Sequence, residues 1–197
     1  MKIDVSFIVF AKKWRDKEGR GRIEWKKEGG CLFFAPYNRA AAVAYAHRWA
    51  YGRNPAFYDY EKLGGDCTNF ASQCLYAGSG VMDYLPVYGW YYLSPNQKSP
   101  SWTGVAYLYN YLTRTKPSPG PTAQEVTLDA LEPGDIIQLS FDGISYQHTP
   151  VVVSAQRASS PSDVLVAAHS YDADNRPLST YEYQSAKFLH ITGIWKE

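Results

Sequence analysis

Apolar side chains in the first half of the chain recur every three or four residues, which is the spacing of one face of an α-helix. The first such segment, residues 38–50, is rich in alanine, begins at an N-capping Asn38 and is followed by Gly52. A second helix is expected directly after Asp66, and a third is expected to be capped by Ser101. The apolar stripe of the third consists of Trp102, Val105, Leu108 and Leu112.

The second half of the chain changes to short apolar runs separated by turns, a pattern typical of β-strands. A Pro-Gly-Asp turn leads into the first run within residues 131–139, and further runs cover residues 148–154, 164–170 and 188–195. Because helical patterns come first and strands follow, the sequence predicts an α+β fold in which helices pack on an antiparallel sheet from the C-terminal half.

The stretch between residues 81 and 100 is aromatic and irregular. A loop of this length within a compact domain is usually functional or disordered, and its aromatic content argues against disorder. Trp90 and Tyr91, together with Trp102 of the third helix, are therefore candidate walls of a substrate groove. The alternative is that these rings form an aromatic cluster packed under the loop.

Residues 1–30 differ from the rest of the chain, since they hold nine Lys or Arg against five Asp or Glu. We expect either a basic arm that contacts an acidic surface or a solvated, poorly ordered extension before a single domain over residues 31–197. The apolar run at residues 5–11 is short and follows Asp4, so neither a secretory signal nor a membrane span is predicted. Localisation stays open, with the cell wall or the exterior as the destination if the protein is exported.

Composition narrows the function classes. With 197 residues and 45% hydrophobic residues, the chain fits one globular domain with a sizeable core, and a monomer is expected. A net charge of +1 gives no sign of the strongly basic surface that binds nucleic acids. Cys67 and Cys74 are separated on one helix by roughly 10.5 Å, too far for a disulfide or a shared zinc ion. With Cys31 as the third cysteine, no disulfide framework, metal or other cofactor is predicted.

Cys67 is the candidate nucleophile because it follows Gly64, Gly65 and Asp66 at the expected start of the second helix. A helix N-terminus lowers the pKa of a thiol, and its unpaired backbone N–H groups can stabilise an oxyanion. The Cys67 N–H is therefore the expected oxyanion donor. Cys74 lies on the apolar face of the same helix, where a cysteine usually acts as a small core residue.

His148 is the candidate general base, because it stands at the start of an apolar strand directly after a polar turn. His169 comes late in the next strand, and in an antiparallel pair the start of one strand lies beside the end of the next. The two histidines are therefore expected to be neighbours. Each has a simpler interpretation as a surface residue, which is the one we favour for His47. His190 could face either solvent or the sheet.

Several stretches together resemble the putative amidase domain family, within the papain-like cysteine hydrolases and related to the NlpC/P60 and CHAP peptidoglycan amidases. The resemblance covers about residues 36–195 and leaves residues 1–30 outside. The stretches that carry it are Tyr37-Asn38-Arg39, Gly64-Gly65-Asp66-Cys67-Thr68-Asn69-Phe70-Ala71-Ser72-Gln73-Cys74, Ser101-Trp102, Leu131-Glu132-Pro133-Gly134-Asp135 and His148-Thr149-Pro150-Val151.

The resemblance implies a papain-like core and a thiol-dependent amide hydrolase acting on a peptide or peptidoglycan-type substrate. Cys67 matches the nucleophile, His148 the base and His169 the third, orienting residue. Asp172 and Asn175, in the following loop, are alternatives for the third position, and Tyr58 or Tyr60 could assist at the oxyanion. Other functions stay open: an acyltransferase or transglutaminase-like enzyme, an inactive cell-wall binding module, or an interaction protein that uses its basic N-terminal arm.

Overall fold

The computed structural model describes residues 11–15, 21–27, 30–155 and 157–197, with side chains from residue 31 onward. Within these residues the helices are α1 (Arg39–Trp49), α2 (Cys67–Ser79), α3 (Pro100–Thr103) and α4 (Val105–Leu112), and the short 3-10 segments are η1 (Glu61–Leu63), η2 (Leu128–Ala130), η3 (Pro161–Asp163) and η4 (Leu178–Thr180). The strands are β1 (Ala11–Arg15), β2 (Gly21–Lys27), β3 (Gly30–Ala35), β4 (Tyr92–Ser94), β5 (Gln97–Lys98), β6 (Gly120–Val126), β7 (Ile136–Ser140), β8 (Val151–Ser154), β9 (Leu165–Ala168), β10 (Ala173–Pro177) and β11 (Ser185–Lys196).

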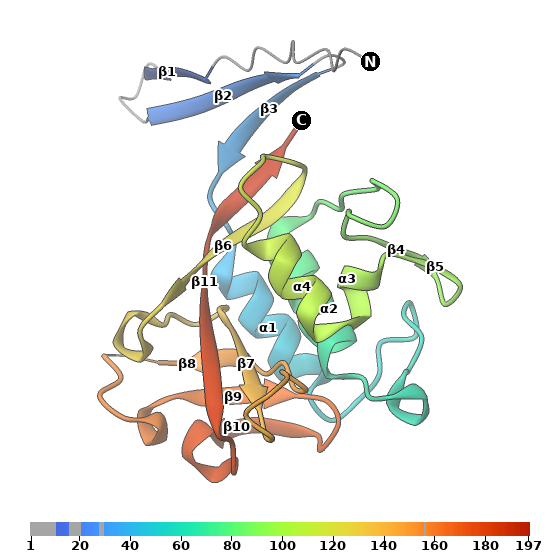
Figure 1. Ribbon diagram of the computed structural model, residues 1–197, viewed down its shortest axis with the longest axis vertical. Coiled ribbons are helices and arrows are strands. Elements are labelled where there is room, and N and C mark those ends of the chain that lie inside the picture. Colours follow the sequence, from blue (N-terminus) through green and yellow to red (C-terminus); the bar gives the residue numbers. More distant parts are fainter. Residues whose placement is uncertain (1–10, 16–20, 28–29, 156) are drawn as a thin grey trace.

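The large sheet is built around the long strand β11. Its order is β1-β2-β3-β11-β7-β8-β9-β10, and β6 pairs with β11 outside this path. Every pairing in the described part of the sheet is antiparallel. Figure 1 shows β7 to β10 at the lower end of the molecule and β1 to β3 at the upper end, with β11 running between them. The fold class is therefore α+β, as the sequence predicts.

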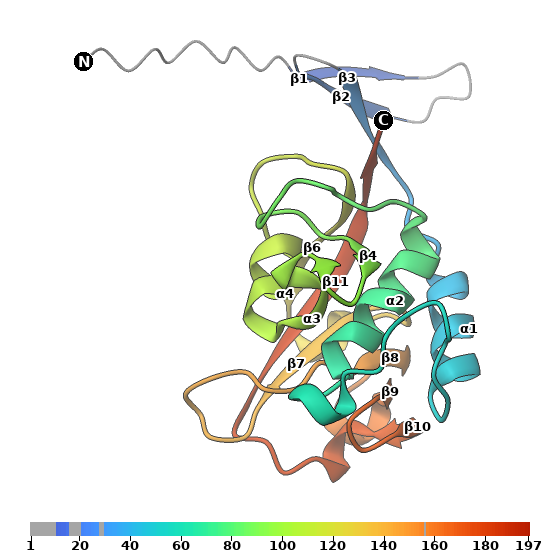
Figure 2. The same ribbon diagram turned by 90° about the vertical axis from the view of Figure 1, so that its right-hand side faces the viewer.

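Helix α2 lies between α1 and the α3–α4 pair, as Figure 2 also shows. Asn38 caps α1 as expected, since its side chain accepts a hydrogen bond from the Ala41 N–H at 3.1 Å. Helix α2 begins at Cys67, with Asp66 in the N-cap position, and ends at Gly80, which has a left-handed φ of 65°. The sequence thus places both helix starts correctly.

Two hydrophobic clusters lie on opposite faces of β8, and the alternation along this strand separates them. Val151 and Val153 belong to the first cluster, which includes Phe70 and Leu75 of α2. Val152 belongs to the second, on the other face. Further members of the second cluster are Ile137, Leu139, Val164, Val166, Leu178 and Tyr181. The sheet therefore holds α2 on one face and a smaller core on the other.

Several elements differ from the sequence prediction. The third helix is capped by Ser99 rather than Ser101, and extended backbone at Gly104 divides it into α3 and α4. Strand β8 begins at Val151, three residues later than predicted, and His148 makes only an isolated bridge to Leu139. Pro150 has no N–H to donate, which limits regular pairing at this point. Strands β6 and β10 are not predicted, because their sequences lack an apolar run.

The N-terminal extension is strand-forming in the part that the structure describes. Strand β1 pairs with β2, and β2 pairs with β3. The expectations for residues 1–10, 16–20 and 28–29 lie outside the described residues. Strand β3 spans the boundary expected at residue 30 and joins the large sheet through β11. In the described part of the chain, no helix has the length and apolarity needed to cross a bilayer.

Candidate active site at the start of helix α2

A tight turn places Cys67 at the first position of α2. Gly64 and Gly65 both have a left-handed φ of 106°, which favours glycine. A Cβ on Gly65 would also lie 3.1 Å from the Ser170 hydroxyl oxygen. That hydroxyl accepts a hydrogen bond from the Asp66 N–H at 2.7 Å. The loop after β9 therefore fixes the turn from which α2 starts.

The fully buried carboxylate of Asp66 binds groups around the helix rather than capping it. Its Oδ1 accepts hydrogen bonds from the Tyr60 N–H at 2.9 Å and from Asn69 Nδ2 at 2.8 Å. Its Oδ2 lies 2.6 Å from His169 Nδ1. Cys67 is the first residue of the helix, so its N–H has no acceptor within the helix, and it makes no hydrogen bond within the described residues. This N–H is the donor expected for an oxyanion.

His169 does not orient His148, contrary to the sequence prediction. Its Nδ1 pairs with Asp66, and its Nε2 hydrogen-bonds to the Trp49 carbonyl oxygen at 2.8 Å. Its ring also stacks on Phe70, with centroids 4.0 Å apart. Both ring nitrogens are therefore used, and His169 links the start of α2 to the end of α1.

The Cys67 thiol is buried against the segment that contains His148. Its Sγ lies 3.9 Å from the Gln147 carbonyl oxygen and 3.8 Å from Thr68 Oγ1, and only 7% of the residue is exposed. Burial raises the pKa of Cys67 above its ordinary value, while hydrogen bonds from Thr149 and Thr68 oppose the rise. Loss of solvation therefore opposes the lowering of the thiol pKa that is expected from the helix start.

His148 is buried and follows Gln147, whose carbonyl oxygen contacts the Cys67 thiol. It makes no hydrogen bond to Cys67 itself. Its ring contacts the rings of Phe141 and Tyr181, with centroids 6.3 and 5.5 Å away. Its Nε2 is buried and has no hydrogen-bond partner. Burial, followed by the positive charge of Arg176, lowers the pKa of His148 to about 4. The imidazole is therefore neutral at neutral pH and has a nitrogen able to receive a proton.

The alternative third residues do not reach His148 either. Asp172 forms a two-pronged ion pair with Arg53, with oxygen–nitrogen distances of 2.9 and 3.0 Å. Asn175 is exposed and has a left-handed φ of 53°. Neither makes a hydrogen bond to His148 in the described structure, so ring contacts alone fix this imidazole.

Tyr58 and Tyr60 support the site through their backbone rather than their hydroxyl groups. The Tyr60 hydroxyl donates to the Pro95 carbonyl oxygen at 3.2 Å, while its N–H donates to Asp66. The Tyr58 carbonyl oxygen accepts a hydrogen bond from Asn69 Nδ2 at 3.0 Å. The Tyr60 hydroxyl is therefore bound at Pro95 rather than at the oxyanion position expected from the sequence, and Tyr58 contributes a backbone carbonyl to the site.

The prediction that Trp90 and Trp102 wall a groove is wrong, because both side chains are fully buried. The Trp90 Nε1–H donates to Ser72 Oγ at 3.0 Å, and the Trp102 Nε1–H donates to Asn69 Oδ1 at 2.8 Å. Their rings pack 4.9 Å apart in the core behind α2. Tyr91 is half-buried and packs against Tyr84. The aromatic segment therefore holds α2 in place.

Tyr181 is a site residue that sequence reasoning missed. It follows η4, far from every motif, and is 9% exposed, with a buried hydroxyl and a ring that lies under the Arg176 guanidinium. Among the residues whose side chains are described, no group of three or more His, Cys, Asp or Glu is arranged to hold a metal ion.

Comparison with known proteins identifies the family of the chain. The family described as "Putative amidase domain" matches residues 36–192. The chain belongs to the putative amidase domain family. Membership indicates an amide hydrolase and implies an amide substrate. The family match begins within the segment before α1, so the strands β1 and β2 lie outside it.

A relative in Bacillus subtilis (strain 168), "Uncharacterized protein YhbB", is 37% identical over 165 residues. The match covers 79% of this chain and 50% of the relative, so the chain spans about half the length of that protein. No solved structure matches the chain significantly.

Proposed function

We propose that this member of the amidase family is a cysteine-dependent amide hydrolase with a papain-like core. The observation that carries the proposal is the placement of Cys67. It is the first residue of α2, its N–H is unpaired, and its Sγ contacts the backbone that leads into His148. This contact supports a site in which Cys67 supplies the thiol and the oxyanion donor and His148 supplies a neutral imidazole, the set that acyl transfer requires.

In this mechanism the Cys67 sulfur attacks the amide carbonyl carbon while its proton passes to His148. The Cys67 N–H donates a hydrogen bond to the oxygen that becomes negative. His148 then gives the proton to the departing amine, and a thioester remains on Cys67. Water, deprotonated by His148, hydrolyses the thioester and releases the carboxylic acid. Since the thiol and imidazole are not yet hydrogen-bonded, substrate binding must bring them into contact, as often happens in enzymes.

We further propose that packing, rather than a third hydrogen-bonding side chain, positions the base. Phe141 and Tyr181 hold the His148 ring, whereas His169 acts on Asp66. The roles in this proposal are therefore nucleophile for Cys67, base for His148 and support of the helix start for His169.

The proposed substrates are peptide amides, beginning with the stem peptides of bacterial cell walls. The resemblance to NlpC/P60 and CHAP amidases in the cysteine and histidine segments supports this choice. It also implies that the protein acts outside the cell or at the cell wall.

The test compares Cys67→Ala with Cys74→Ala on purified peptidoglycan and on synthetic stem peptides. Both positions carry buried thiols on the same helix, so Cys74→Ala is a matched control for loss of a sulfur. We expect Cys67→Ala to abolish amide hydrolysis and Cys74→Ala to retain it with reduced stability. Hydrolysis by Cys67→Ala at the wild-type rate would contradict the proposal. Accumulation of a new amide when amines are added would identify an acyltransferase instead.

A further inference from the structure

Arg176, on β10, has a guanidinium group that is not neutralised by a carboxylate. Its Nε donates to Thr180 Oγ1 at 2.7 Å and its Nη2 to the Thr180 carbonyl oxygen at 2.9 Å. No ion pair joins it to any residue in the described part of the chain, and its Nη1 makes no hydrogen bond there. By contrast, Arg39 pairs with two carboxylates, Glu132 and Asp135.

The guanidinium lies 3.8 Å above the centre of the Tyr181 ring. Among the described residues, Nε2 of the neighbouring His148 is buried with no hydrogen-bond partner, and the buried Tyr181 hydroxyl has Arg176 beside it. A buried polar group without a partner destabilises the fold. Such a nitrogen, close to a cation that forms no ion pair with the described residues, is typical of a site that receives a polar ligand.

This cluster belongs to the same site as the proposed nucleophile. Burial raises the pKa of Tyr181, Arg176 opposes the rise, and the Cys67 thiol adds to it. Arg176 also acts on His148. The Tyr181 ring contacts both the Arg176 guanidinium and the His148 ring, so the basic group lies beside the proposed base.

We propose that Arg176 and Tyr181 form a subsite that binds a carboxylate of the substrate next to the scissile amide. The free Nη1 and the Tyr181 hydroxyl can each donate a hydrogen bond, and the two oxygens of a carboxylate can accept them. The negative charge of the carboxylate is also attracted to the positive charge of Arg176. A cationic substrate group would be repelled at the same place. The choice of substrate rests on the proposed hydrolase function, whereas binding of the carboxylate can be measured without hydrolysis.

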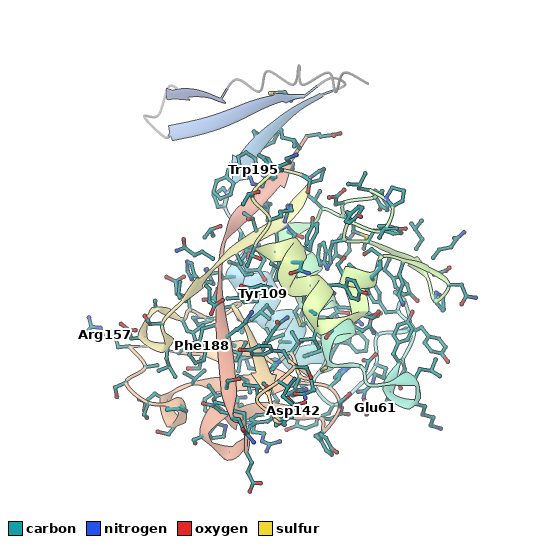
Figure 3. All side chains as sticks on the ribbon, viewed as in Figure 1. Glu61, Tyr109, Asp142, Arg157, Phe188 and Trp195 are labelled. Atoms are coloured by element: carbon teal, nitrogen blue, oxygen red, sulfur yellow. The ribbon has the colours of Figure 1, made fainter. Side chains whose placement is uncertain are left out.

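The binding test uses Cys67→Ser protein and glutarate as a carboxylate probe, with NMR signals of the His148 ring as the readout. Glutarate should shift these signals and raise the His148 pKa, because its charge offsets that of Arg176. The same titration of Arg176→Gln should produce no shift. The control is Arg157→Gln, since Arg157 extends from the β8–β9 loop at the edge of the molecule in Figure 3. Absence of a shift in the parent, or an equal shift in Arg176→Gln, would overturn the proposal.

The specificity test compares paired peptides that carry Glu or Gln on either side of the scissile amide. We expect the ratio of kcat/KM for Glu over Gln peptides to fall about tenfold in Arg176→Gln, the loss typical of one charged hydrogen-bonding contact. Tyr181→Phe should also lower the ratio, while Tyr183→Phe, two residues away, should not. Arg176→Lys should restore part of the preference, which shows that a folding defect is not the cause.

The two proposals fail in different ways. No hydrolysis of any peptide by the wild-type protein, together with glutarate binding that depends on Arg176, would refute the hydrolase and leave the subsite. Hydrolysis that depends on Cys67 but treats Glu and Gln peptides alike would refute the subsite and leave the hydrolase.

Discussion

At the scale of single residues, burial decides the protonation states of the proposed pair. Cys67 is 7% exposed and His148 is 5% exposed. Loss of solvation disfavours the charged form of each, so the pKa of Cys67 rises and that of His148 falls. The pair therefore rests as a neutral thiol and a neutral imidazole, and proton transfer must accompany attack on the substrate.

The low pKa of His148 predicts acid destabilisation. The folded imidazole titrates at about 4, whereas the unfolded one titrates at about 6.5. Between these values the unfolded chain binds more protons, so the free energy of unfolding falls as the pH drops from 6.5 to 4. The expected loss is on the order of 3 kcal/mol. Urea unfolding measured across this pH range checks the prediction.

His148→Gln should not show this fall in the free energy of unfolding between pH 6.5 and 4, whatever the effect of the substitution on stability at pH 8. His47→Gln is the comparison variant, because His47 lies on the surface, 40% exposed and 2.8 Å from Asp174. It should still show the loss of stability that depends on His148. If His148→Gln and the wild type lost stability in parallel between pH 6.5 and 4, His148 would not be the group responsible.

The sequence identifies the residues whose local context is informative and misses those whose partners are distant. Cys67 follows a glycine pair at a helix start, and His148 precedes a strand, so both can be identified from the sequence. In the sequence Asp66 marks only a helix start, because its contact with His169 joins positions that are 103 residues apart. Tyr181 carries no local signal, since only folding places it between His148 and Arg176.

At the scale of elements, α1 and α2 meet at a glycine. The first residues of α1 are tied to α2 by a hydrogen bond from the Asn38 N–H to the Gly78 carbonyl oxygen at 3.0 Å. A Cβ added at Gly78 would come within 2.3 Å of the Tyr37 ring. Gly78 therefore allows the two helices to pack closely.

We predict that Gly78→Ala destabilises the protein even though alanine favours a helix. The gain in helix propensity is about 1 kcal/mol, whereas forcing a methyl group into a packed site costs about 1–3 kcal/mol. Thermal unfolding should show a lower midpoint. Gly52→Ala is the control, since its Cβ would meet only the Trp49 ring, at 3.7 Å. An unchanged midpoint in Gly78→Ala would contradict the packing described.

The aromatic stretch shows why an element's role is hard to predict from its composition. A run of tryptophan and tyrosine suits both a binding groove and a core, and only the register of the loop decides between them. Here Trp90 and Trp102 direct their indole N–H groups to Ser72 and Asn69 of α2. The rings that the sequence predicts to line a substrate groove therefore donate hydrogen bonds to polar side chains of α2.

At the scale of the whole molecule, the N-terminal strands lie far from the proposed site. Figures 1 and 2 show β1, β2 and the start of β3 at one end, with β7 to β10 at the other. The family match also begins after them, at residue 36. The fold class and the position of the helix that begins at Cys67 can be predicted from the sequence, whereas the extension of the sheet by this segment cannot.

We predict that deletion of residues 1–29 leaves amide hydrolysis unchanged, because the described strands of this segment pair only with one another and with β3. The measurement is kcat/KM on the same synthetic peptides, with circular dichroism as a check on folding. Loss of a binding partner with hydrolysis intact would assign the segment to an interaction. Loss of hydrolysis in a folded deletion variant would show that the segment completes the site.

The long strand β11 has a consequence for how the protein is made. Strands β3, β6 and β7 all pair with it, yet each is synthesised before it. On the ribosome these strands must wait with unsatisfied edges until residues 185–196 emerge. Exposed strand edges promote aggregation, so this interval is the period when the nascent chain most needs a chaperone. Slow translation just before β11 would lengthen that interval and lower the yield of folded protein.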